Sequence, residues 1–280
     1  MIRLRRGRDA ASLGAFTGAK LQQRLLKLEG YFYEDGGHVD FKPKARQIWS
    51  TAKPALKVDS AGKCAYCEAD TAVVAHGDVE HFRPKDRYWW LAYCVDNYTF
   101  SCQVCNQVYK GNTFPVTGAR LKPPRMPAAQ PADATKAAAL AATFCLDPAG
   151  ATDASLKRFF AGEQPHLPDP YLVDPEKLLS WNAIEETHEV WLIARGRSAK
   201  AKAAAKAAEE VLGLNRTELL RLRWNHYDLL RTLALAFQEM DPASPNAAKV
   251  LAGIRRRADG DQPFAGMTRH FLRTWGLLAA

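Results

Sequence analysis

The sequence predicts an α+β protein, mainly helical, around a small core of two strands and a helix that a zinc site ties together. One observation is a pair of C-x-x-C motifs, Cys64/Cys67 and Cys102/Cys105, separated by 34 residues. A second is the apolar spacing in the flanking regions, which is typical of amphipathic helices. A third is the composition: 280 residues, of which 47% are hydrophobic and 25% charged, match an ordinary globular protein. No apolar run reaches the roughly 18 residues of a membrane span, so we expect no membrane association.

The N-terminal region, 1–60, is predicted to be helical. Apolar residues recur at mostly helical spacings over 9–28, and Gly30 is the expected stop. Residues 44–56 indicate a second helix, which Pro54 should interrupt.

The four paired cysteines predict a structural zinc site. Two C-x-x-C motifs can supply four thiolates in a tetrahedron, whereas a single motif is also typical of a redox pair. The 34-residue gap exceeds the roughly 15–20 residues of a zinc ribbon, so a folded insert must lie between the motifs. Cys94 and Cys145 stand alone and are expected to be small buried hydrophobes. Thiolate ligands and unpaired cysteines fit a reducing, cytoplasmic environment.

The insert and its surroundings, 61–115, read as strand, long loop, strand and helix. Residues 78–82 are predicted to form a strand that ends before Pro84, because proline cannot extend the interior of a sheet. Residues 97–101 alternate aromatic and small polar side chains, as a second strand would. A short helix should begin near the second cysteine pair and stop at Gly111.

The residues of this segment resemble the HNH endonucleases with a zinc-bound ββα-metal core. The similarity lies in C-A-Y-C, E-H-F-R-P-K at 80–85, N-Y at 97–98, C-Q-V-C-N at 102–106 and K-G-N at 110–112. Two weaker features, D-P-Y-L-V-D-P at 169–175 and G-L-N-R at 213–216, resemble one branch of the family. That branch contains the HNH subunit of Septu-type anti-phage defence and the HNH proteins of related retron systems.

The resemblance implies a metal-dependent endonuclease that hydrolyses the phosphodiester bonds of DNA. His81 would be the general base, because the ordinary histidine pKa lies near working pH. Glu80 and Asn106 would hold one Mg²⁺ or Mn²⁺ ion through oxygen atoms, and Asn97 would brace the loop that positions His81. Many HNH enzymes have Asp or His at the position of Glu80, and His at that of Asn106. The loss of nitrogen ligands should reduce affinity for softer metals.

Each of these residues also has a structural interpretation. His81 could be a buried histidine with its hydrogen bonds satisfied, and Glu80 could pair with Arg83 or Lys85. Both asparagines could serve as turn or cap residues. Asp78 is expected to be an exposed strand residue, although it could replace Glu80 as a ligand.

The basic character of the chain fits an anionic partner. Thirty-nine Lys and Arg against 30 Asp and Glu leave a net charge of +9. Arg83, Lys85 and Lys110 flank the proposed base and are predicted to contact a phosphate backbone. A solvated basic loop is the alternative for the charged residues around 120–125.

The remainder is predicted to be a linker followed by a helical C-terminal region. Proline-rich residues 116–132 should be extended, and 133–280 should be helical apart from a short strand at 188–195. Ser198 is expected to cap a helix that ends at Gly213, Asn215 to cap one that runs to about Met240, and Ser244 to cap a third. A final helix is expected over 264–278.

The chain has no P-loop motif and so no recognisable ATPase of its own. The resemblance implies a separate ATPase subunit, for which the helical C-terminal region offers a docking surface. Two other functions remain open at this point: a zinc-stapled module that binds nucleic acid or protein without catalysis, and a nuclease that cuts RNA, for example tRNA.

Overall fold

The computed structural model describes residues 1–71 and 75–279. Within them the helices are α1 (Ala10–Leu13), α2 (Gly18–Glu34), α3 (Lys53–Asp59), α4 (Ala134–Ala141), α5 (Asp153–Phe159), α6 (Ala199–Glu210), α7 (Thr217–Gln238), α8 (Pro245–Arg256) and α9 (Ala265–Thr274). The strands are β1 (Asp78–His81), β2 (Tyr98–Ser101), β3 (Leu179–Ile184) and β4 (Glu189–Ala194). The predicted α+β class with mainly helical content is therefore confirmed. Within the described ranges, no helix combines the length and the apolar character needed to cross a bilayer.

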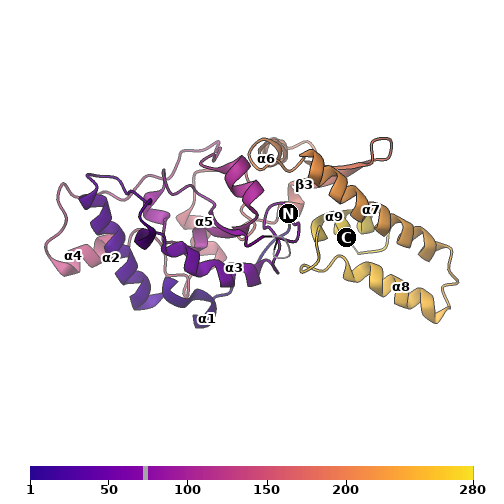
Figure 1. Ribbon diagram of the computed structural model, residues 1–280, viewed down its shortest axis with the longest axis horizontal. Coiled ribbons are helices and arrows are strands. Elements are labelled where there is room, and N and C mark those ends of the chain that lie inside the picture. Colours follow the sequence, from indigo (N-terminus) through magenta and orange to yellow (C-terminus); the bar gives the residue numbers. More distant parts are fainter. Residues whose placement is uncertain (72–74, 280) are drawn as a thin grey trace.

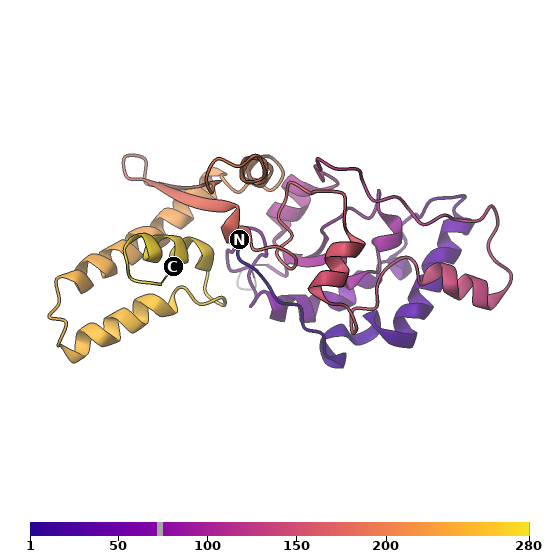
Figure 2. The same ribbon diagram turned by 180° about the vertical axis from the view of Figure 1, so that it is seen from behind.

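The molecule is elongated, with its two ends built from different parts of the chain (Figure 1). Helices α1–α5 lie towards one end, and α7, α8 and α9 form the other, with α6 and the cysteine-bearing segment between them. The view from behind shows the same division (Figure 2). One buried apolar cluster nevertheless runs from Leu21 on α2 through Cys105 to Phe271 on α9, so the two ends share a core.

The central unit consists of two antiparallel strands and a π-helix, Val104–Lys110. Strands β1 and β2 pair with Glu80 opposite Thr99 and His81 opposite Tyr98. Both strands lie within the ranges that the sequence predicts, and the π-helix ends at Lys110 because Gly111 adopts a φ of +45°. The predicted strand–loop–strand–helix order is therefore present in the structure.

Two expectations for the N-terminal region are wrong. Helix α2 does not stop at Gly30 but continues to Glu34. A glycine inside a helix costs only about 1 kcal/mol, and the buried face formed by Leu21, Leu25 and Leu28 outweighs it. Pro54 does not interrupt a helix either. It lies in the first turn of α3. The backbone N–H that proline lacks would have no partner within the helix at this position, so the helix loses no hydrogen bond.

Helices α4 and α5 lie at the same end of the molecule as α1–α3. Gln22 on α2 donates a hydrogen bond to the Ala138 carbonyl on α4, and both views show these helices together. Asp153 at the start of α5 pairs with Arg3. Residues 116–132, which precede α4, contain no helix or strand, as the proline content predicts; a single bridge joins Val116 to Pro165.

The C-terminal region confirms two predicted caps and corrects a third. Ser198 accepts a hydrogen bond from Ala201 N at the start of α6, and Ser244 caps α8 in the same way. Asn215 does not cap α7. Its side chain bonds both backbone groups of Leu192 on β4, at 2.9 Å each, and so attaches the turn before α7 to the sheet. Strand β3, the partner of β4, was not predicted.

Candidate functional site

The four paired cysteines form one cluster. The sulfur atoms of Cys64, Cys67, Cys102 and Cys105 all lie within 4.8 Å of one another, and the Cys67–Cys102 distance is 4.0 Å. Four sulfurs at about 2.3 Å from a tetrahedral zinc ion would be about 3.8 Å apart, so this arrangement fits the ion. The other three thiols lower the pKa of Cys102 through their hydrogen bonds, and a thiolate is the form that binds metal. The four cysteines can therefore hold a structural metal ion such as zinc.

The G-L-N-R segment of the C-terminal region packs against this cluster. Arg216 donates a hydrogen bond to Cys105 Sγ at 3.7 Å, which offsets negative charge on the thiolates. Gly213 adopts a φ of +58°, and a Cβ there would lie 2.4 Å from the Tyr109 ring. Only glycine fits this contact between the turn before α7 and the π-helix. The segment that resembles one nuclease branch thus connects the C-terminal region to the cysteines.

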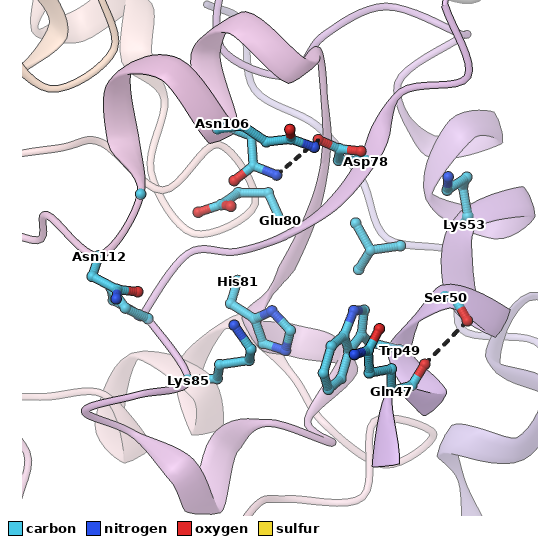
Figure 3. A pocket seen from close by; sticks show the side chains of 14 residues that line it. Gln47, Trp49, Ser50, Lys53, Asp78, Glu80, His81, Lys85, Asn106 and Asn112 are labelled. Atoms are coloured by element: carbon cyan, nitrogen blue, oxygen red, sulfur yellow. Dashed lines mark hydrogen bonds between the residues drawn. The ribbon is translucent and has the colours of Figure 1, made fainter. Parts of the chain in front are cut away.

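The structure brings Glu80, His81 and Asn106 to one open cavity of about 460 Å³ (Figure 3). Glu80 and His81 come from the end of β1, and Asn106 comes from the π-helix that carries Cys105. Neighbours on a strand normally point to opposite faces, but β1 ends at His81 and both residues line the cavity. Asp78 and Lys85 also contribute to its wall.

His81 is buried and its orientation is fixed by one hydrogen bond. Nε2 lies 3.1 Å from the carbonyl oxygen of Ala92, which can only accept, so Nε2 carries the proton. The rings of Trp49 and Tyr98 meet the imidazole edge-on at 5.0 and 4.9 Å between centroids. Burial lowers the pKa of His81 from 6.5 to about 3. The imidazole is therefore neutral at physiological pH, with the proton on Nε2 and the lone pair on Nδ1.

Glu80 is also buried, and it pairs with Lys110. Lys110 additionally donates to the carbonyl oxygen of His81 at 3.0 Å. Burial raises the pKa of Glu80, and the charge of Lys110 opposes that effect. Neither Arg83 nor Lys85, the partners considered from the sequence, makes this ion pair. The ammonium group of Lys110 therefore neutralises the Glu80 carboxylate, which the sequence predicts to be a metal ligand.

Asn106 is held by Asp78. Its Nδ2 donates to Asp78 Oδ2 at 3.0 Å, and Gln107 Nε2 donates to the same oxygen at 2.8 Å. With the amide nitrogen used in this way, the amide oxygen of Asn106 is the atom left for a metal ion. The sequence treats Asp78 as an exposed strand residue or a substitute ligand; the structure shows it orienting Asn106.

Asn97 lies outside the cavity and braces the chain that follows His81. It is fully buried, accepts a hydrogen bond from Arg83 N at 2.8 Å and donates one to Arg83 O at 3.0 Å. These two bonds fix the backbone two residues beyond His81.

Two of the three predicted phosphate contacts do not agree with the structure. The Arg83 side chain is 2% exposed and pairs with Glu163 at 2.6 Å, and that of Lys110 is completely buried. Both charges are neutralised inside the protein, so neither side chain can reach a nucleic acid backbone. Lys85 is partly exposed and lines the cavity, as does Lys53, which the sequence did not single out.

The lone cysteines are structural, as predicted, and so are the aromatic residues of the long loop. Cys94 and Cys145 are buried and are not joined by a disulfide. Trp90 and Tyr93 are buried, and Trp89 stacks on Phe32 with 4.5 Å between ring centroids.

A comparison with curated proteins gives one relative. Over 79 residues the chain is 38% identical to Septu protein PtuB of Bacillus mycoides (strain KBAB4), which covers 24% of this chain and 27% of that protein. The match thus spans about a quarter of the relative's length, and it supports a relationship with Septu proteins over that stretch. No family model and no solved structure matches the chain, so HNH membership stays a prediction.

Replacing Lys110 tests whether Glu80 is a metal ligand. Lys110→Met leaves a buried carboxylate without its partner, and we expect the free energy of unfolding to fall by about 3–5 kcal/mol. Mn²⁺ should restore part of that stability if it binds Glu80, and denaturant unfolding with and without Mn²⁺ measures both effects. The double variant Lys110→Met/Glu80→Gln is the control: it should be more stable than Lys110→Met alone and should gain nothing from Mn²⁺. Equal rescue of both variants would exclude Glu80 as the ligand.

The lowered pKa of His81 should make stability depend on pH. Between about 3 and 6.5 the unfolded chain binds a proton at this residue and the folded protein does not. The contribution of His81 to the free energy of unfolding is therefore complete above pH 6.5. It falls by about 1.4 kcal/mol for each pH unit as the pH drops below that value. His81→Gln should flatten the curve by this amount between about pH 5 and 6.5, with bound zinc measured in parallel. Identical slopes for both proteins would show that His81 is not buried as a neutral group.

Proposed function

We propose that this protein is a metal-dependent endonuclease of the HNH type that hydrolyses phosphodiester bonds in DNA. The observation that supports it best is the meeting of Glu80, His81 and Asn106 at one open cavity, beside a four-cysteine cluster. A neutral histidine next to two oxygen donors is what water activation and phosphate charge neutralisation require. The similarity to a Septu protein over 79 residues supports the same proposal.

In this proposal the buried histidine acts as the base. Its Nδ1 takes a proton from the attacking water, while the bond from Nε2 to Ala92 O keeps the ring in position. Asn97 holds the backbone of the adjoining loop, so its role is positioning and not contact with substrate.

The metal site of the proposal uses Glu80 and the amide oxygen of Asn106. Hard oxygen ligands with room for water suit Mg²⁺ or Mn²⁺, which would offset charge on the phosphate. Asp78 holds Asn106 in the required orientation. Lys85 and Lys53 line the same cavity, and in this proposal they contact the phosphates that flank the scissile bond.

The similarity to a Septu protein over 79 residues supports a place in anti-phage defence. In this proposal a separate ATPase subunit controls cutting. The C-terminal helices offer a surface for such a partner, because Leu222 and Leu229, seven residues apart on α7, are about half exposed. Leu219, Tyr227 and Leu230 of the same helix are buried and belong to the core.

The test is hydrolysis of defined substrates by the purified, zinc-loaded protein. Supercoiled plasmid, labelled duplex DNA and tRNA are incubated with Mg²⁺, Mn²⁺ or EDTA, with and without a candidate ATPase subunit. Plasmid nicking that requires Mg²⁺ or Mn²⁺ supports the proposal. Cleavage of tRNA but not of DNA would show that the substrate is RNA. Binding without hydrolysis under every condition would favour a non-catalytic zinc module.

A further inference from the structure

Arg223, on the buried face of α7, is a charged side chain whose hydrogen-bonding atoms are unused. Its relative exposure is 1%, and its Nε and Nη1 atoms have no hydrogen-bond partner within the described ranges. Burial lowers the pKa of Arg223 to about 10, so the guanidinium stays protonated at physiological pH. A buried cation without a partner is costly, so its presence here calls for a negative charge close by.

The negative charge nearest to Arg223 belongs to the cysteine cluster. Negative groups oppose the lowering of the Arg223 pKa, and this effect comes first from Cys67 and then from Glu68. Glu68 already has partners, because its carboxylate accepts hydrogen bonds from the amino group of Met1 and from Gly266 N. The thiolates of the cluster are therefore the negative charge that remains for Arg223.

A second arginine reaches the same cluster from the residue before α7. Arg216 donates a hydrogen bond through Nη1 to Cys105 Sγ at 3.7 Å. Arg216 and Arg223 are seven residues apart, which is about two helical turns, so they lie on the same side of α7. Long side chains on a helix lean towards its N-terminus, which directs the Arg223 guanidinium back towards Arg216 and the sulfur atoms.

Two arginines match the charge of a divalent ion that four thiolates hold. Such a centre carries two net negative charges, and in the low-dielectric interior of a protein this charge is costly unless cations compensate it. Arg216 and Arg223 supply one positive charge each. The same pairing accounts for the buried guanidinium of Arg223, because the metal centre would be its counter-ion.

We propose that Arg216 and Arg223 are charge-balancing residues of the metal centre, which together neutralise a divalent ion bound by Cys64, Cys67, Cys102 and Cys105 and so raise its affinity. The proposal is independent of the nuclease assignment, because it concerns the affinity of the metal and not catalysis. It also gives α7 a role at this centre, whose charge attracts the helix to the central unit.

The test is the zinc affinity of the full chain, measured at equilibrium by competition with a chelator of known affinity. Arg223→Met removes the charge but keeps a long unbranched side chain, and it should weaken zinc binding by about 10–100-fold. Arg223→Lys keeps the charge and should stay within about threefold of the parent, because Nε and Nη1 make no hydrogen bond that lysine would lose. Arg221→Met is the matched control, since Arg221 is exposed on the same helix, and it should leave the affinity unchanged.

A spectroscopic readout separates charge from packing. Co²⁺ bound by thiolates absorbs in the near ultraviolet through electron transfer from sulfur to metal, and a positive charge beside the sulfurs makes that transfer harder. In the cobalt-loaded Arg223→Met protein this band should therefore move to longer wavelength. Arg223→Lys and Arg221→Met should leave it in place.

Thermal melting of the zinc-loaded variants checks their folding. If Arg223→Met does not fold, Arg216→Met decides the question, because Arg216 is partly exposed and its loss should also weaken zinc binding by about tenfold. A folded Arg223→Met protein, or in its place Arg216→Met, that binds zinc as tightly as the parent would overturn the proposal. Equal loss of affinity in Arg223→Met and Arg223→Lys would overturn it as well, since that result would assign the side chain to packing.

Discussion

Replacing Cys105 with serine is expected to abolish metal binding and to unfold the central unit. The four sulfurs lie within 4.8 Å of one another, and losing one leaves three thiols, two of them buried, around an incomplete site. Structural zinc contributes about 10–16 kcal/mol in small zinc domains, which equals or exceeds the usual net stability of about 5–15 kcal/mol. We therefore expect the variant to be largely insoluble or to melt far below the parent, as circular dichroism and metal analysis of the purified protein would show.

Cys145→Ser is the matched control, because this cysteine is equally buried and lies outside the cluster. The substitution should lower the free energy of unfolding by about 1–3 kcal/mol, because it buries a hydroxyl group. The variant protein should retain one zinc ion per chain. A soluble Cys105→Ser protein with normal melting and full zinc content would contradict the four-cysteine site.

The cysteine cluster also explains why distant parts of the chain form one core. Arg216 reaches Cys105 from the start of α7, while Asn215 attaches the same turn to β4. The π-helix that carries Cys105 also carries Asn106 and Lys110, which meet β1. Loss of the metal should therefore disturb both the candidate active site and the packing of the C-terminal helices.

The sequence predicted the central unit well because its signals are local. The cysteine spacing, the alternation before Cys102 and the glycine after Lys110 each act over a few residues, and β1, β2 and the π-helix followed from them. Strand β3 was missed because its exposed and buried residues alternate only in part, and its pairing with β4 decides its conformation.

The burial of charged residues was not predictable from local pattern. Arg83 and Lys110 stand in a basic stretch that reads as a phosphate-binding surface, yet each meets a carboxylate brought by another element. For Arg83 that partner is Glu163, 80 residues away. Likewise, Asn215 precedes a helix and has the right type for a cap, but β4 uses its side chain instead.

His81→Gln should remove nicking activity while leaving the protein folded. The glutamine amide can keep the hydrogen bond to Ala92 O, but it cannot accept a proton from water. Loss of a general base lowers the rate by about 10²–10⁴-fold. Plasmid nicking at saturating Mn²⁺, with thermal melting of the same preparation, measures the two properties separately.

The same substitution at His226 provides the comparison. His226 bonds Thr268 at 3.0 Å in the C-terminal region and does not line the active-site cavity, so His226→Gln should nick at the parent rate. A folded His81→Gln protein that still nicks plasmid like the parent would exclude His81 as the base. Loss of activity in both variants would show that the assay reports overall integrity. Loss in His81→Gln alone, with Mn²⁺ still bound, would place the defect in proton transfer, because the metal ligands proposed here do not include the histidine.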